Sequence, residues 1–202
     1  NAFKPDLSAL HALAIDANDQ LYIAGPSEIH VTDMTGAEIQ RIETVQTVTA
    51  LAADPRGSVY AASNGAIRQY NSTGLVKNFE NVPADAVITS IVKIDEVIFA
   101  ADARNKQLLK FDTTGQRTAT FDGRTDDTAP PHFVVPSPHL DLAVAGHDKL
   151  WVVNPGRHTL ELFDFDGNMR ASWQRSSMRL EDFCGCCNPT HIALLSDGTI
   201  VT

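Results

Sequence analysis

The stretch ADARNKQLLKFDTTG, residues 101–115, contains an apolar segment, a polar loop, a second apolar segment and an Asp-x-x-Gly turn. The same turn, with Asp or Asn in first place, occurs at residues 33–36, 71–74, 112–115 and 164–167. Successive turns begin 38, 41 and 52 residues apart, so the chain repeats a unit and its longest interval contains an insertion. A repeat of this length predicts an array of similar supersecondary units.

Each unit contains four short apolar segments, two upstream of the turn, one directly before it and one after it. The segments are bounded by Asp, Asn, Gly and Pro, which is typical of β-strands and not of helices. The expected units cover residues 11–43, 47–80, 88–122 and 139–174, with a partial fifth at 190–202; an insertion at 122–138 and a connector at 174–189 separate the later ones.

Four-stranded antiparallel units at this period are typical of the blades of a β-propeller. The competing architecture is a β-sandwich, which does not require the same turn residues to return at a blade-length period. We therefore predict an all-β chain in which residues 1–202 form a single, incomplete β-propeller domain.

Several stretches resemble NHL repeats. Residues 13–16 followed by 21–24, and residues 101–115, are similar to the family pattern, in which "IAVD" and "VYVAD" segments precede an Asn-x-x-Ile/Val and an Asp-x-x-Gly turn. Residues 26–29 and 157–160 depart from this pattern because they lack its Asn.

The later part of the chain further resembles a group of uncharacterised bacterial NHL-repeat proteins that carry a Gly-Cys-Cys-Asn-Pro motif, present here at 185–189. The resemblance extends over residues 133–145, 154–158 and 183–195. It implies a six-bladed fold and no particular activity. Four units and part of a fifth do not close a ring, so we expect a fragment of a six-bladed propeller, completed by the remainder of the same chain or by a protein partner.

The composition argues against two classes of partner. The 16 Lys and Arg residues are outnumbered by 25 Asp and Glu residues, and a formal charge of −9 repels nucleic acid. No apolar run approaches the roughly 18 residues of a membrane-spanning helix. We expect neither nucleic-acid binding nor membrane insertion.

All three cysteines lie together in the connector, at Cys184, Cys186 and Cys187. They are candidates for a disulfide or a redox centre, for metal ligation together with His191, or for reduced thiols packed as small apolar groups. Adjacent cysteines are poorly spaced for one tetrahedral metal site. A disulfide would favour a periplasmic or extracellular location.

Alignment of the units places Asp141 and His191 at equivalent positions on neighbouring blades, at the start of an inner strand. These side chains could converge with Cys187 on a divalent metal ion at the mouth of the central channel. Alternatively, both side chains satisfy backbone groups between blades. No further cofactor is indicated.

The insertion and the connector map to the same rim of the propeller, which makes this rim a candidate contact face. Its candidate contact residues are His132, Phe133, Pro136 and His139. Because no nucleophile, base and orienting residue are recognisable together, the leading hypothesis is a non-catalytic binding or scaffold module. The alternatives are a metal-dependent hydrolase or lyase at the channel mouth, and a thiol redox or electron-transfer partner.

Overall fold

The computed structural model describes residues 10–124, 132–174, 189–195 and 197–202. The described residues form four antiparallel sheets of four strands each, here called blades 1 to 4, and one C-terminal hairpin. The strands are β1 (Ala12–Ile15), β2 (Leu21–Ala24), β3 (Glu28–Thr32) and β4 (Glu38–Glu43) in blade 1; β5 (Ala50–Ala53), β6 (Val59–Ser63), β7 (Ala66–Asn71) and β8 (Gly74–Asn78) in blade 2; β9 (Ile88–Ile94), β10 (Val97–Asp102), β11 (Gln107–Asp112) and β12 (Arg117–Phe121) in blade 3; β13 (Leu142–Ala145), β14 (Lys149–Asn154), β15 (Thr159–Asp164) and β16 (Met169–Gln174) in blade 4; and β17 (Ala193–Leu194) and β18 (Ile200–Val201) in the hairpin.

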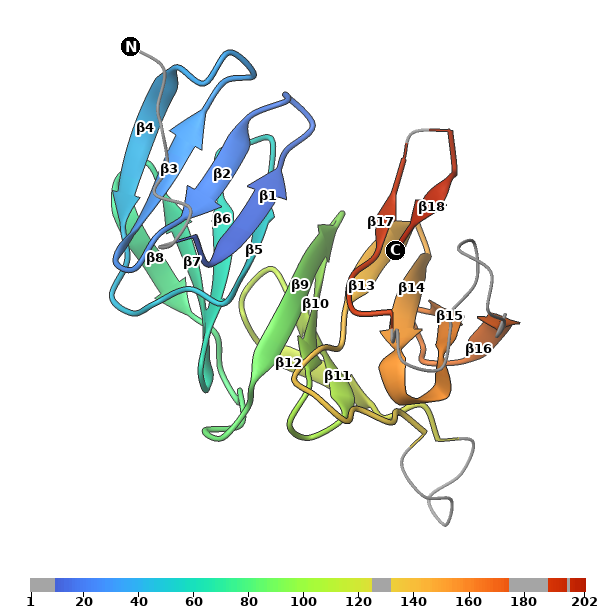
Figure 1. Cartoon of the computed structure of the whole chain (residues 1–202). Helices are drawn as coiled ribbons and strands as arrows, with labels where there is room; N and C mark the ends of the chain where they lie inside the picture. The colour runs from blue at the N-terminus through green and yellow to red at the C-terminus, as the bar shows by residue number, and fades with distance from the viewer. Residues whose placement is uncertain (1–9, 125–131, 175–188, 196) are drawn as a thin grey trace.

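The blades follow one another around an arc, with β1, β5, β9, β13 and β17 on its inner side (Figure 1). Consecutive inner strands contact each other, from β1 to β5, β5 to β9, β9 to β13 and β13 to β17. The fourth strand of each blade lies on the outer side and is largely exposed. The prediction of an all-β chain built from four-stranded antiparallel blades is confirmed.

Each Asp/Asn-x-x-Gly repeat forms the turn between the third and fourth strands of a blade. In blade 3, Asp112 Oδ1 accepts hydrogen bonds from Thr114 N at 2.9 Å, Thr114 Oγ1 at 2.6 Å and Gln116 N at 3.0 Å. The same bonds hold the turn that begins at Asp33. The recurrence of Asp or Asn therefore has a local cause, because this side chain caps the turn's backbone donors.

The core consists of apolar layers between neighbouring blades. In the layer between blades 2 and 3, the ring centroids of Phe79 and Phe111 are 5.2 Å apart, and Phe79 also meets Tyr60. The other layers join blade 1 to blade 2, blade 3 to blade 4 and blade 4 to the hairpin. Stacking of this kind buries both faces of an interior blade.

The arc does not close, and its two ends expose apolar side chains. On β1, Ala12 and Ala14 pack against blade 2, whereas the alternating side chains Leu13 and Ile15 are 53% and 60% exposed. The hairpin packs on blade 4 through Leu194 and Ile200, and its opposite face exposes Val201. Figure 1 shows β1 and the hairpin on either side of the gap. In the described ranges, no helix is long and apolar enough to cross a membrane.

Candidate functional site

The inner strands surround a concavity of about 660 Å³. Its polar lining residues are His11, Thr49, Thr89, Ser90, Asp141 and His191. An adjoining pocket of about 300 Å³ shares Thr49, Thr89, Asp141 and His191 and adds Pro138 and His139. This end of the concavity is called the channel mouth below.

The hydroxyl groups at the channel mouth join neighbouring blades. Thr49 Oγ1 on blade 2 donates a hydrogen bond to Ile88 O on blade 3 at 2.8 Å. Thr89 Oγ1 on blade 3 donates to Leu140 O at the start of blade 4 at 2.7 Å. These side chains therefore satisfy backbone groups of the next blade.

The Asp141 carboxylate makes the same kind of junction one blade further on. Its Oδ1 accepts a hydrogen bond from Leu142 N at 2.8 Å, and its Oδ2 accepts one from Ile192 N at 3.0 Å, beside the hairpin. Asp141 thus contributes to the junction of blade 4 with the hairpin.

His191 lies beside Asp141, with 3.4 Å between His191 Nδ1 and Asp141 Oδ2. The His191 side chain is 76% exposed, whereas that of Asp141 is 17% exposed. The His139 ring meets the His191 ring edge-on, with a centroid distance of 5.8 Å. The structure therefore brings together three residues that the sequence assigned to two separate roles.

Cys184, Cys186 and Cys187 lie outside the described residues, so their disulfide, redox or metal-binding roles stay predictions. Among the residues that are described, no group of three or more His, Cys, Asp or Glu side chains is placed to hold a metal ion. The predicted combination of Asp141, His191 and Cys187 therefore also stays a prediction.

Residues 132–139, called the strap below, are anchored on blade 4 by a buried carboxylate. Glu161 on β15 is 2% exposed, and its Oε2 lies 2.9 Å from His132 Nε2. Glu161 Oε1 accepts hydrogen bonds from Asn154 Nδ2 at 3.1 Å and Thr159 Oγ1 at 2.8 Å. Asn154 Oδ1 in turn accepts a hydrogen bond from Val134 N at 2.9 Å. Buried polar groups connected in this way fix the position of the strap.

A close backbone approach completes the anchor. Gly156 N donates a hydrogen bond to Val134 O at 2.7 Å, and a Cβ atom at Gly156 would lie 2.6 Å from that oxygen. Glycine is therefore required where the β14–β15 connection meets the strap.

The predicted contact residues of the rim occupy different environments. Phe133 is 1% exposed and packs against Phe163, so its position in the core excludes it from a contact surface. Pro136 is exposed, and His132 and His139 are half-buried. Phe133 packs the strap against blade 4. Of the four predicted contact residues, Pro136 is the most accessible.

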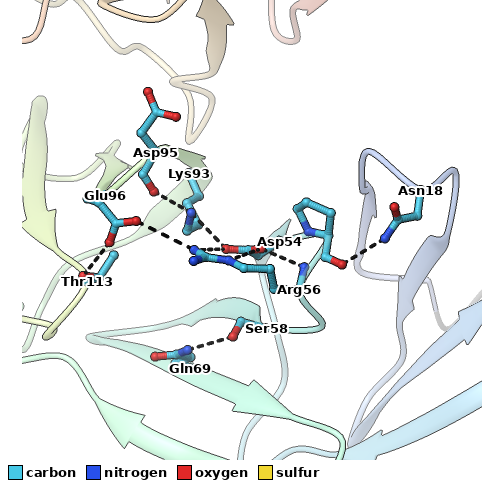
Figure 2. Close-up of polar contacts among 10 residues, drawn as sticks. Asn18, Asp54, Arg56, Ser58, Gln69, Lys93, Asp95, Glu96 and Thr113 are labelled. Carbon is cyan, nitrogen blue, oxygen red and sulfur yellow. Dashed lines mark hydrogen bonds and ion pairs between the residues drawn. The ribbon is translucent and has the colours of Figure 1, made fainter.

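A second polar cluster lies at the opposite end of the inner strands (Figure 2). Asp54, after β5, is 3% exposed, and its Oδ2 lies 2.9 Å from Lys93 Nζ on β9 and 3.0 Å from Arg56 Nη2. Arg56 Nη2 also lies 3.9 Å from Glu96 Oε1, in the β9–β10 turn. On the other side, Asn18 Nδ2 donates to Pro55 O at 2.9 Å. The cluster links blades 1, 2 and 3.

Burial alone would raise the pKa of Asp54, but hydrogen bonds from Arg56 and Lys93 outweigh it and hold the pKa well below its usual range. On blade 1, burial and then the neighbouring Asp16 carboxylate raise the pKa of Tyr22 to about 12. Asp54 is therefore a paired anion at neutral pH, which suits an interblade clamp.

Sequence reasoning missed the buried carboxylates Glu161 and Asp54, and the nearly buried Lys93 that pairs with Asp54. The sequence of β9 contains a signal for Lys93, because this residue lies on an inner strand among apolar residues, and a buried Lys requires an acidic partner. Glu161 likewise interrupts the apolar series of β15.

No protein-family model matches the chain, and no curated relative is detected. Solved structures do match. The fold is that of a β-propeller. A streptogramin B lyase structure superposes with a TM-score of 0.68 at 12% identity, covering 98% of this chain and 63% of that one. A protein of unknown function from Bacteroides caccae gives 0.67 at 11% identity, covering 95% and 69%.

The WD40 β-propeller domain of Doa1 gives a TM-score of 0.62 at 16% identity, covering 95% of this chain and 60% of that one. The chain thus spans 60 to 69% of the length of these three structures. At such identities the similarity establishes the propeller architecture alone.

Proposed function

We propose that the chain belongs to an NHL-type propeller that acts as a non-catalytic binding or scaffold module, with the strap as part of its contact face. The observation that carries the proposal is the anchoring of the strap by Glu161, Asn154 and Gly156, while Val134 is 39% exposed and Pro136 and Pro138 are exposed. A segment held rigidly and presented to solvent loses little conformational entropy on binding.

The hydrogen bonding of the polar groups at the channel mouth supports the same proposal. Its threonine hydroxyls and the Asp141 carboxylate bond to backbone groups of neighbouring blades. Groups used in this way are poorly available for proton transfer, whereas a binding module needs them only as structural links.

The test is site-specific photo-crosslinking in the cells that produce the protein, with a benzophenone amino acid at position 136. The matched control places it at Ser72, an exposed turn residue at the other end of the strands. We expect a discrete adduct from position 136 alone, and its loss in the Glu161→Ala background. Equal labelling from both positions, or none from position 136, contradicts the proposal.

A metal-dependent hydrolase or lyase at the channel mouth is the second candidate. It is supported by the contact of Asp141 with His191 beside a pocket, and by the similarity of the fold to streptogramin B lyase. This candidate requires bound metal that is lost in His191→Ala. Unchanged metal content in that variant would exclude it.

Thiol redox or electron transfer through the cysteines is a further candidate, which rests on their clustering in the sequence. It requires a reactive thiolate. Slow reaction of all three thiols with a thiol reagent in the folded protein would contradict it.

We also propose that protein, from a partner or from further residues of the same polypeptide, covers the exposed faces of β1 and the hairpin. Exposed edges and apolar faces of sheets favour association. The intact mass of the protein in its native host, compared with 21.9 kDa, distinguishes the two sources.

A further inference from the structure

We propose that His139 and His191 together bind a divalent metal ion of the Zn²⁺ or Cu²⁺ class at the channel mouth, and that Asp141 orients His191 without ligating the ion. The inference does not depend on the binding-module proposal. It differs from the expectation drawn from the sequence, because His139 takes the place of Cys187 and Asp141 is a positioning residue.

The spacing of the two rings fits a shared ion. Zn–N bonds of about 2.0–2.1 Å place the centroids of two imidazoles on one ion roughly 5 to 6.5 Å apart. The observed centroid distance of His139 and His191 is 5.8 Å. Imidazole nitrogen is a preferred ligand of both Zn²⁺ and Cu²⁺.

The oxygens of Asp141 are already engaged. Oδ1 accepts the Leu142 N–H, and Oδ2 accepts the Ile192 N–H and faces His191 Nδ1. A carboxylate that faces one ring nitrogen favours the proton there and leaves the other nitrogen free to ligate, as in carboxylate–histidine–metal triads. With Nδ1 turned to Asp141, Nε2 of His191 is the ligating atom.

His139 is held in place by its neighbours. The next residue, Leu140, is fully buried. Its backbone N donates a hydrogen bond to Thr89 Oγ1 at 3.3 Å, and its backbone O accepts one from the same hydroxyl. On the other side, the strap anchor fixes residues 132–134. The His139 backbone therefore has little freedom to leave the channel mouth.

The pocket leaves space for other ligands of the ion. It has a volume of about 300 Å³ and opens beside the larger concavity. Zinc sites with an open position usually have three protein ligands, so two imidazoles would leave further positions of the ion to water or to a small anion.

The test measures Zn²⁺ binding to the full chain by isothermal titration calorimetry, with the cysteines either free or alkylated. We expect one site that survives alkylation and that His139→Ala and His191→Ala each weaken at least tenfold. His147→Ala is the matched control, because His147 is 95% exposed in the β13–β14 turn, away from the pocket. The affinity of His147→Ala for Zn²⁺ should equal that of the wild type.

Asp141→Asn tests the positioning role. We expect 10- to 100-fold weaker binding, the usual effect of removing such a partner. Thr118→Val changes an exposed residue of β12 that lines neither pocket, and it should bind Zn²⁺ normally. Binding that is unchanged in both histidine variants, or that disappears on alkylation, overturns the proposal.

Discussion

Lys93 Nζ lies 2.9 Å from Asp54 Oδ2, and this contact joins the inner strand of blade 3 to the β5–β6 turn of blade 2 (Figure 2). Both side chains are nearly buried, at 9% and 3% exposure. Loss of one partner of a buried ion pair leaves an uncompensated charge and is strongly destabilising.

Lys93→Met should therefore lower the free energy of unfolding by about 3 kcal/mol, the lower end of the range for a buried pair, since Arg56 still contacts Asp54. Urea denaturation measures the effect. Lys149→Met is the control, because Lys149 pairs with Asp148 at the surface and should cost less than about 1 kcal/mol. Equal losses in the two variants would show that the Asp54 contact has no special role.

The stability of the protein should fall in acid partly through Asp54. Its folded-state pKa is held below the unfolded value of about 3.9, so its contribution is present above that pH and is lost as pH falls toward the folded pKa. Asp54→Asn should lower stability at neutral pH and flatten the decline below about pH 4. Denaturation midpoints measured from pH 6 to pH 2 give the comparison, and parallel curves for the two proteins would contradict it.

Gly65 should be far less replaceable than Gly57. Both have positive φ, +67° and +86°, so alanine carries a backbone strain of about 1–2 kcal/mol at either position. At Gly65 the added Cβ would also lie 2.4 Å from Ala84 O, whereas nothing lies within 4 Å at Gly57. Overpacking adds about 1–3 kcal/mol, so thermal denaturation should show a clearly larger loss for Gly65→Ala. Similar losses of stability would mean that the segment between β8 and β9, which contains Ala84, moves to accommodate the added methyl group.

Thr89→Val should weaken the junction of blades 3 and 4. The hydroxyl bonds both Leu140 O at 2.7 Å and Leu140 N at 3.3 Å, and its loss leaves buried backbone groups without a partner. We expect about 1–3 kcal/mol of destabilisation. Thr118→Val, on the exposed strand β12, should change stability by less than about 0.5 kcal/mol. A result in which both variants match the wild type would argue against the interblade role.

Glu161→Ala should release the strap while the blades stay folded. Asn154 and His132 then lose their shared partner, and the amide of Val134 loses a fixed acceptor. Hydrogen exchange should accelerate at least tenfold at Val134 and Gly156. Glu96→Ala, at an exposed turn, should leave these amides protected. Protection that persists in Glu161→Ala would show that apolar packing of Phe133 alone holds the strap.

The sequence was informative wherever a local pattern repeats. The recurring Asp/Asn-x-x-Gly turn predicted repeated four-stranded units, and each copy lies between the third and fourth strands of a blade. The alignment of inner strands placed Asp141 and His191 at equivalent positions, and the registers of β13 and β17 agree with that alignment. These predictions depend on alternation and turn chemistry, which act over a few residues.

Contacts between distant segments could not be predicted in the same way. Phe133 looks like a surface residue in a Pro-rich insertion, and only the packing of the strap on Phe163 explains its burial. The pairing of Lys93 with Asp54 depends on how strand β9 of blade 3 meets the β5–β6 turn of blade 2. Such meetings are set by the stacking of blades, so neither segment alone identifies its partner.

The junctions at the channel mouth all run in one direction along the chain. Thr49 reaches forward to blade 3, Thr89 to blade 4, and Asp141 to the hairpin. In the part of the chain that the structure describes, these links thus couple each blade to the next one, as in a one-dimensional array, where stability is a sum of unit and interface terms. Thermal fraying should start at the open ends of the arc and advance blade by blade, so blades 2 and 3 should be the last to exchange their amide protons.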